Sequence, residues 1–161
     1  MSVLNVGDTA PDFPLPASAD GLRTLYDCLA RGPVLLYFYP ADFTRVCTAQ
    51  ACMLRDAEPV LAASSVRIIG VSPQGEESHS SFVARYGLPF SLVADTDHAI
   101  TRLYGVTALF GLLTRRVTFL ISREGAIVDR AVADFSVSSH QDLVRRAIAS
   151  VGRTVCGASS R

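Results

Sequence analysis

The chain has 161 residues, of which 49% are hydrophobic and 19% are charged, as in folded globular proteins. Fifteen basic residues balance fifteen acidic ones, so the net charge gives no basis for binding nucleic acid or an anionic membrane. Every basic residue is arginine, which excludes Schiff-base lysine chemistry and the phosphate-loop lysine. The N-terminus lacks a signal-peptide pattern and no apolar run is long enough to span a bilayer. We therefore expect a cytoplasmic protein.

The first part of the chain predicts one buried strand between two helices. Residues 7–22 contain three prolines and two glycines, which predict an extended lead-in with a short edge strand. A short helix over residues 25–29 precedes the apolar run 34–39, which is typical of a central, doubly buried strand. A helix is predicted to begin at Thr44, and Pro59 is expected to end or kink it.

The rest of the chain continues this alternation and closes with a hairpin and a helix. The predicted strands cover 66–72, 89–95, 117–122 and 126–132, the predicted helices cover 78–86, 98–104 and 140–149, and residues 107–116 are predicted to form a loop. This order predicts one α/β domain over residues 1–150, with a central mixed β-sheet flanked by helices on both faces. Residues 151–161 are expected to form a flexible C-terminal tail.

The segment between the first central strand and the next helix contains the most reactive residue types. Thr44 is a plausible N-cap, because its hydroxyl could accept a hydrogen bond from the backbone N–H of Cys47. Cys47 would then lie in the first helical turn, where unpaired N–H groups and the helix dipole favour a thiolate, the nucleophilic form of cysteine. We interpret Cys47 as a reactive thiol and Cys52 as its partner.

The spacing of these two cysteines predicts a conformational change. Residues five apart on an ideal helix have Cα atoms roughly 8.6 Å apart, whereas a disulfide spans at most about 7 Å between Cα atoms. A bond between Cys47 and Cys52 therefore requires the first turns of the helix to unwind.

The remaining cysteines and histidines carry weaker signals. Cys28 is interpreted as a small core residue, and Cys156 as a thiol without a role in the tail. His79, His98 and His140 are scattered, and we expect them at helix starts or on the surface, because their spacing to the cysteines does not fit a zinc site.

The run from Phe38 to Cys47 contains Pro-x-x-x-Thr-x-x-Cys and resembles the signature of peroxiredoxins. With Cys52 five residues later, it resembles the bacterioferritin-comigratory-protein branch, also called peroxiredoxin Q. Similar segments recur in the same order at residues 7–15, 78–90, 104–106 and 116–121. The resemblance implies a thioredoxin-like fold and a thiol-dependent peroxidase of hydrogen peroxide and organic hydroperoxides. It further implies a monomer without metal or organic cofactor, recycled by a thioredoxin-like or glutaredoxin-like reductant.

The resemblance also implies a role for each residue of the motif. Cys47 would be the peroxidatic cysteine, which becomes a sulfenic acid, and Cys52 the resolving cysteine, which condenses with it to an intramolecular disulfide. Pro40 would shield the thiolate from water. Thr44 and the backbone N–H of Cys47 would hold the peroxide, and Arg116 would lie beside the sulfur.

Three positions qualify this assignment. Gln50 stands where the family usually has Glu, so a contact that orients Arg116 would lose its charge. Arg45 adds a positive charge close to the reactive cysteine. Arg115 would take the place of Arg116 if the strand register differed by one residue.

Two other functions compete with the peroxidase. A general thiol–disulfide oxidoreductase is disfavoured, because such enzymes usually have C-x-x-C and a proline before the facing strand, whereas this chain has C-x₄-C and Val117 before Thr118. A redox sensor or holdase, whose helix unfolding exposes a surface for a partner, stays open as an alternative.

Overall fold

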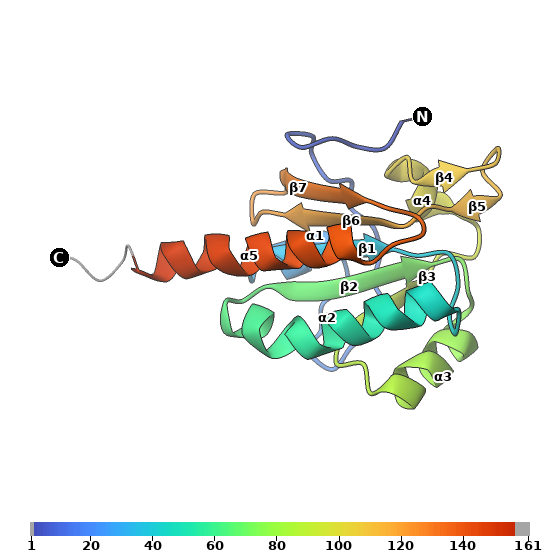
Figure 1. The fold of residues 1–161 in the computed structure, drawn as a ribbon, viewed down its shortest axis with the longest axis horizontal. Helices are drawn as coiled ribbons and strands as arrows, with labels where there is room; N and C mark the ends of the chain where they lie inside the picture. The colour runs from blue at the N-terminus through green and yellow to red at the C-terminus, as the bar shows by residue number, and fades with distance from the viewer. Residues whose placement is uncertain (1, 157–161) are drawn as a thin grey trace.

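The structure is a computed structural model that describes the backbone of residues 2–156 and the side chains of residues 2–150. Its centre is a five-stranded mixed sheet in the order β3-β2-β1-β6-β7 (Figure 1). The strands are β1 (Val34–Phe38), β2 (Arg67–Ser72), β3 (Ser91–Ala94), β6 (Val117–Ile121) and β7 (Ile127–Val132). β1, β2 and β3 are parallel, and β6 is antiparallel to both β1 and β7.

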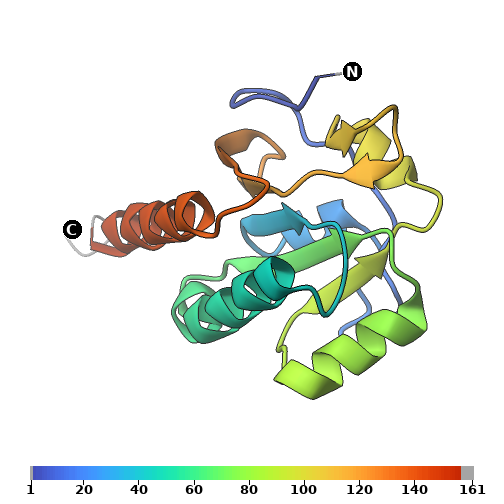
Figure 2. The same ribbon diagram turned by 45° about the vertical axis from the view of Figure 1, so that its right-hand side comes forward.

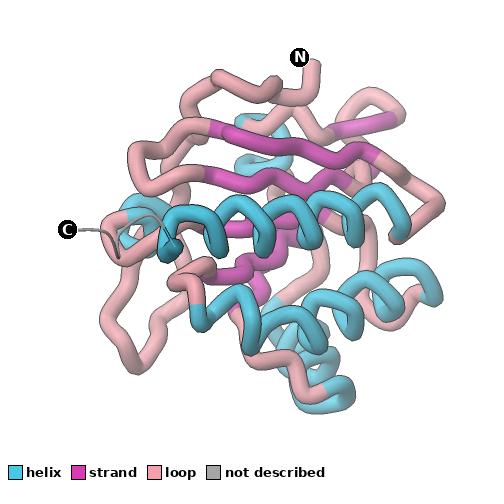
Figure 3. The backbone as a smooth tube through the Cα atoms, turned by 60° about the vertical axis from the view of Figure 1, so that its left-hand side comes forward, coloured by secondary structure: helices cyan, strands magenta, loops and turns pink. Residues whose placement is uncertain are grey.

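Helices cover both faces of this sheet, as predicted. The helices are α1 (Leu25–Leu29), α2 (Arg45–Ala63), α3 (Glu76–Tyr86), α4 (Ala99–Leu103) and α5 (Ser138–Cys156). Figures 2 and 3 show α2 and α5 side by side along one face. Side chains of α2, α3 and α5 pack there against Leu35, Tyr37 and Leu120. On the other face, α1, α4 and the N-terminal segment pack against alternate residues such as Leu36 and Phe38. The uniformly apolar sequence of β1 therefore fills two cores at once.

The structure differs from the sequence-based prediction in four details. Of the two effects predicted for Pro59, ending the helix is wrong, because α2 continues to Ala63. The predicted loop 107–116 contains a small hairpin of β4 (Thr107–Ala108) and β5 (Leu113–Thr114). The extended lead-in forms only isolated bridges, from Thr9 to Ala126 and from Pro14 to Thr24, instead of an edge strand.

The fourth correction concerns the C-terminal helix. It begins at Ser138 and runs to Cys156, so residues 151–156, predicted as part of a flexible tail, are helical. Residues 157–161 of that tail lie outside the described residues. Within the part of the chain that the structure describes, no helix is long and apolar enough to cross a membrane.

The pairing of β1 with β6 fixes which residues surround the start of α2. Phe38, the last residue of β1, pairs with Val117, the first residue of β6. Arg116 therefore lies at the point where β1 ends, next to the loop that leads into α2. This is the carboxyl edge of the parallel strands, where open α/β folds place their sites.

Candidate active site

Cys47 is the third residue of α2 and is buried, with 1% of its surface exposed. Among the described residues, the first turn of α2 receives no side-chain capping bond from Thr44. The first backbone N–H groups of the helix therefore remain available to a ligand at this end, where the helix dipole is positive. Both features favour a negative charge on the sulfur.

Arg116 supplies a full positive charge to the same sulfur. Its Nη2 atom donates to Cys47 Sγ at 3.2 Å, although the two residues are 69 positions apart. The side chain is buried, and its Nε atom donates to the carbonyl oxygen of Asp134 at 3.2 Å. Arg115 instead forms an ion pair with the carboxylate of Asp134 at 3.0 Å. The predicted register thus holds, and Arg116 is the arginine that contacts the thiol.

Gln50 and two more buried residues extend this contact inward. Arg116 Nη1 donates to Gln50 Oε1 at 2.8 Å, and Gln50 Nε2 donates to Thr118 Oγ1 at 3.3 Å. Thr118 Oγ1 lies 2.8 Å from His140 Nδ1. The other ring nitrogen of His140, Nε2, lies 3.1 Å from the carbonyl oxygen of Ala133. Gln50 therefore contacts Arg116 although it lacks the negative charge of the usual Glu.

Thr44 occupies the predicted N-cap position but does not make the predicted bond. Its hydroxyl donates to the carbonyl oxygen of Ala41 at 3.0 Å, and it does not accept from the backbone of Cys47. The hydroxyl proton of the exposed Thr44 side chain is thus donated within the loop, while the lone pairs of the hydroxyl oxygen remain able to accept a hydrogen bond. Pro40 is half-buried directly after Tyr39, at the start of the same loop.

A second buried cluster holds the loop before α2 against α3. The carboxylate of Asp42 accepts from Tyr39 at 2.6 Å and from Ser78 at 2.7 Å, and it lies 2.8 Å from His79 Nδ1. Burial alone would raise the pKa of Asp42, but the bonds from His79, Tyr39 and Ser78 outweigh it and lower that pKa. In the same loop, Phe43 adopts a positive φ of 63°.

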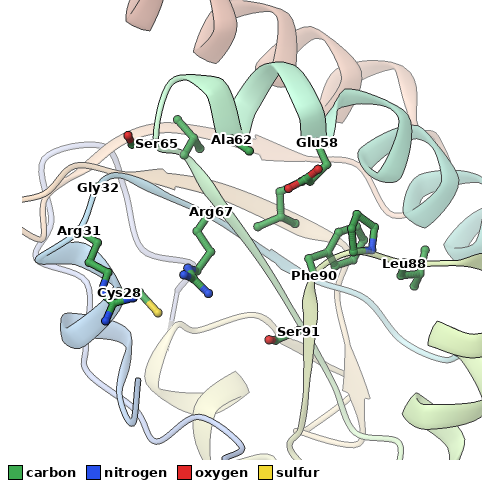
Figure 4. A pocket seen from close by; sticks show the side chains of 13 residues that line it. Cys28, Arg31, Gly32, Glu58, Ala62, Ser65, Arg67, Leu88, Phe90 and Ser91 are labelled. Carbon is green, nitrogen blue, oxygen red and sulfur yellow. The ribbon is translucent and has the colours of Figure 1, made fainter. Parts of the chain in front are cut away.

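The predicted cysteine partner lies on the same helix as Cys47. Cys52 is half-buried, and both thiols are free within an uninterrupted α2. Cys28 is buried in the apolar core as expected, and burial raises the pKa of its thiol. It also lines a cavity of about 600 Å³ with Arg67 and Ser91, residues that begin β2 and β3 (Figure 4). This cavity is at the amino ends of the parallel strands, opposite Cys47, and it takes no part in the thiol site.

The three histidines lie at helix starts, as predicted: His98 is the N-cap of α4, and His79 and His140 lie in the first turns of α3 and α5. Their burial was not predicted, because His79 and His140 are 4% and 1% exposed and are fully engaged in buried polar networks. Their partners Asp42 and Thr118 are 37 and 22 positions away. Local patterns carry no signal for such pairs. Among the described residues, no group of three or more potential ligands could hold a metal ion.

The chain matches a known family over most of its length. Residues 6–130 match the AhpC/TSA family. The sequence is 38% identical over 130 residues to a putative peroxiredoxin bcp of Coxiella burnetii, covering 77% of this chain and 85% of that protein. It is 36% identical over 125 residues to a chloroplastic peroxiredoxin Q of Populus jackii, covering 77% of this chain but only 58% of that protein.

The fold agrees with these sequence matches. The crystal structure of peroxidoxin BcpB from Mycobacterium tuberculosis is similar with a TM-score of 0.79 and 31% identity, over 90% of this chain and 96% of that one. The central mixed sheet with helices on both faces is accordingly a thioredoxin-like fold. The chain belongs to the AhpC/TSA family, in the bacterioferritin-comigratory-protein or peroxiredoxin Q branch of the peroxiredoxins.

Proposed function

We propose that this peroxiredoxin, by its family a thiol-dependent peroxidase, uses Cys47 as its peroxidatic cysteine and Cys52 as its resolving cysteine. The observation that carries the proposal is the contact of Arg116 Nη2 with Cys47 Sγ at 3.2 Å, at the N-terminus of α2. A permanently charged guanidinium and a helix N-terminus are the two groups that best stabilise a buried thiolate.

In the first step, the Cys47 thiolate attacks the terminal oxygen of the peroxide. The O–O bond breaks, the sulfur becomes a sulfenic acid, and the leaving oxygen takes up a proton and departs as water or an alcohol. Arg116 and the N–H groups of the first turn stabilise the charge that develops on that oxygen. Thr44 accepts the hydrogen bond of the peroxide O–H through its free lone pairs, since its own proton is donated to Ala41. Pro40 limits the access of water.

In the second step, the thiol of Cys52 attacks the sulfenic sulfur, a disulfide forms and water leaves. The intact α2 keeps the two residues five positions apart, at a Cα separation of roughly 8.6 Å for an ideal helix. The first turns of α2 therefore unwind before the disulfide forms. A dithiol reductant of the thioredoxin or glutaredoxin type then restores both thiols.

Organic hydroperoxides are proposed as substrates besides hydrogen peroxide. Exposed apolar residues are adjacent in sequence to residues of the site: Phe43, which precedes Thr44, is 49% exposed, and Phe135, which follows Asp134, is 93% exposed. They offer contacts to an alkyl group. We further propose that residues 1–150 act as one domain and that the protein works in the cytoplasm as a monomer, the state that the resemblance implies. Light scattering would test the monomer, and fractionation of cells would test the location.

The test is peroxide-dependent NADPH oxidation coupled through thioredoxin and its reductase, with hydrogen peroxide and cumene hydroperoxide as substrates. Cys47→Ser should abolish turnover. Cys52→Ser should reduce one equivalent of peroxide and then stop, and Cys28→Ser is the matched control that should keep full activity. Full activity of Cys47→Ser would refute the assignment, and capture of a partner by the oxidised protein without turnover would favour a redox sensor instead.

A further inference from the structure

We propose that Thr118 and His140 are positioning residues for the peroxidase reaction: they lock the amide of Gln50 in the one orientation that aims Arg116 at Cys47. Four residues form this chain of contacts: Gln50 is on α2, Thr118 is on β6, His140 is on α5, and Arg116 directly precedes β6. Each of their side chains is at most 3% exposed, so water does not compete for their hydrogen bonds.

The direction of every hydrogen bond in this chain follows from its inner end. The carbonyl oxygen of Ala133 can only accept, so His140 Nε2 carries a proton and donates to it. Burial, together with the positive charge of Arg116, lowers the pKa of His140, which keeps the ring neutral. His140 Nδ1 is therefore an acceptor, and the Thr118 hydroxyl donates to it. The Thr118 oxygen then accepts from Gln50 Nε2.

This direction excludes the other orientation of the Gln50 amide. A flipped amide would turn its NH₂ group toward Arg116 Nη1, placing two donors 2.8 Å apart. It would also turn its oxygen toward Thr118, whose only proton is already donated to His140. A glutamate needs no such lock, because both of its oxygens accept. The neutral glutamine at this position therefore depends on Thr118 and His140 to present an acceptor to Arg116.

Two hydrogen bonds consequently anchor the guanidinium of Arg116 and aim its third nitrogen. Its Nη1 atom is bound to Gln50, its Nε atom to the carbonyl oxygen of Asp134, and its Nη2 atom is left to face Cys47 Sγ. Loss of the Gln50 contact would leave a buried arginine free to rotate about its remaining bonds. Displacements of about 1 Å in such groups cost on the order of a hundredfold in rate. The inference rests on the proposed role of Cys47.

The decisive variants are Thr118→Val, which has nearly the same shape but no hydroxyl, and Thr118→Ser, which keeps the hydroxyl. Thr101→Val is the matched control, since Thr101, on α4, is also fully buried but donates its hydroxyl proton to Asp95, which directly follows β3. Two readouts are measured: kcat/KM for hydrogen peroxide, and the rate at which iodoacetamide alkylates Cys47 across a pH series, which reports the thiolate without any peroxide.

We expect Thr118→Val to lower kcat/KM about ten- to hundredfold and to move the alkylation profile of Cys47 to higher pH, because the thiolate loses its aligned guanidinium. Thr118→Ser should restore both, and Thr101→Val should change neither. His140→Leu should act like Thr118→Val, and the double variant should be no worse than either single one, as for one connected chain. An unchanged alkylation profile in Thr118→Val would overturn the inference, whether or not the wild-type protein turns over peroxide.

Discussion

Replacing Asp42 by asparagine should destabilise the protein strongly, because this carboxylate forms a buried ion pair with His79. The carbonyl oxygen of Val93 lies 3.2 Å from His79 Nε2 and can only accept, so that nitrogen carries a proton. In a neutral ring, Nδ1 would then be an acceptor and would face another acceptor, the Asp42 oxygen, at 2.8 Å. Only a doubly protonated ring donates to both neighbours, and it needs the negative charge of Asp42.

The size of the effect follows from the burial of the pair. The side chains of Asp42 and His79 are 0% and 5% exposed, so neither charge is solvated by water. Removing one partner of a buried pair costs about 3–5 kcal/mol, because the other charge is left uncompensated. For a domain of this size each 1 kcal/mol shifts Tm by roughly 2–4 °C. We therefore expect Asp42→Asn to lower Tm by about 6 °C or more.

Urea and thermal unfolding of Asp42→Asn, His79→Leu and the double variant measure this directly, and a double-mutant cycle isolates the pair. The matched control is Asp20→Asn, because Asp20 also pairs with a basic residue, Arg67, at 3.0 Å, but both side chains are over 30% exposed. The control should change stability far less. If Asp42→Asn were no more destabilised than Asp20→Asn, the assignment of a charged pair would be wrong.

Three further predictions follow from the same structure. Arg116→Gln should lower kcat/KM for peroxide at least about a hundredfold, whereas Arg115→Gln should change it less than about threefold, as steady-state kinetics would show. The folded-state pKa of His140 lies below its ordinary value of 6.5, so the unfolded chain binds a proton first as the pH falls. The folded protein should therefore lose stability as the pH drops below about 6.5. Urea titrations should find a weaker loss in His140→Leu. Gly70→Ala should cost about 1–3 kcal/mol in unfolding experiments, because a Cβ there would lie 2.8 Å from the ring of Tyr37.

Local sequence patterns were sufficient to find the central strands and to place Cys47 in the first turn of a helix, because a continuous apolar strand, a polar loop and a helix start follow one another in the chain. The position of Arg116 beside Cys47, 69 residues away, was expected only from the family resemblance. α2 does not end at Pro59, because a proline removes only one hydrogen bond of its helix. The packing of buried residues on both sides of it, Leu54 and Leu61, holds α2 together.

The polar networks around the site could not be predicted from local patterns. Whether a histidine is buried depends on what the fold brings to it: Asp42 reaches His79 only because the loop before α2 packs on α3. The sequence predicted that the Thr44 hydroxyl accepts a hydrogen bond from the backbone of α2, but in the folded loop it donates to the carbonyl oxygen of Ala41 instead. Such choices are made by tertiary contacts, which a single sequence does not display.

The central claim is that Cys47 is oxidised by peroxide and resolved by Cys52, and peptide mapping tests it most directly. The fully reduced protein is treated with one equivalent of hydrogen peroxide, alkylated, digested and analysed by mass spectrometry. We predict a Cys47–Cys52 disulfide, replaced in Cys52→Ser by a sulfenic acid on Cys47. A Cys47 that bonded to Cys156 or to a second chain would contradict the unwinding of α2, and an unmodified Cys47 thiol would contradict the whole account.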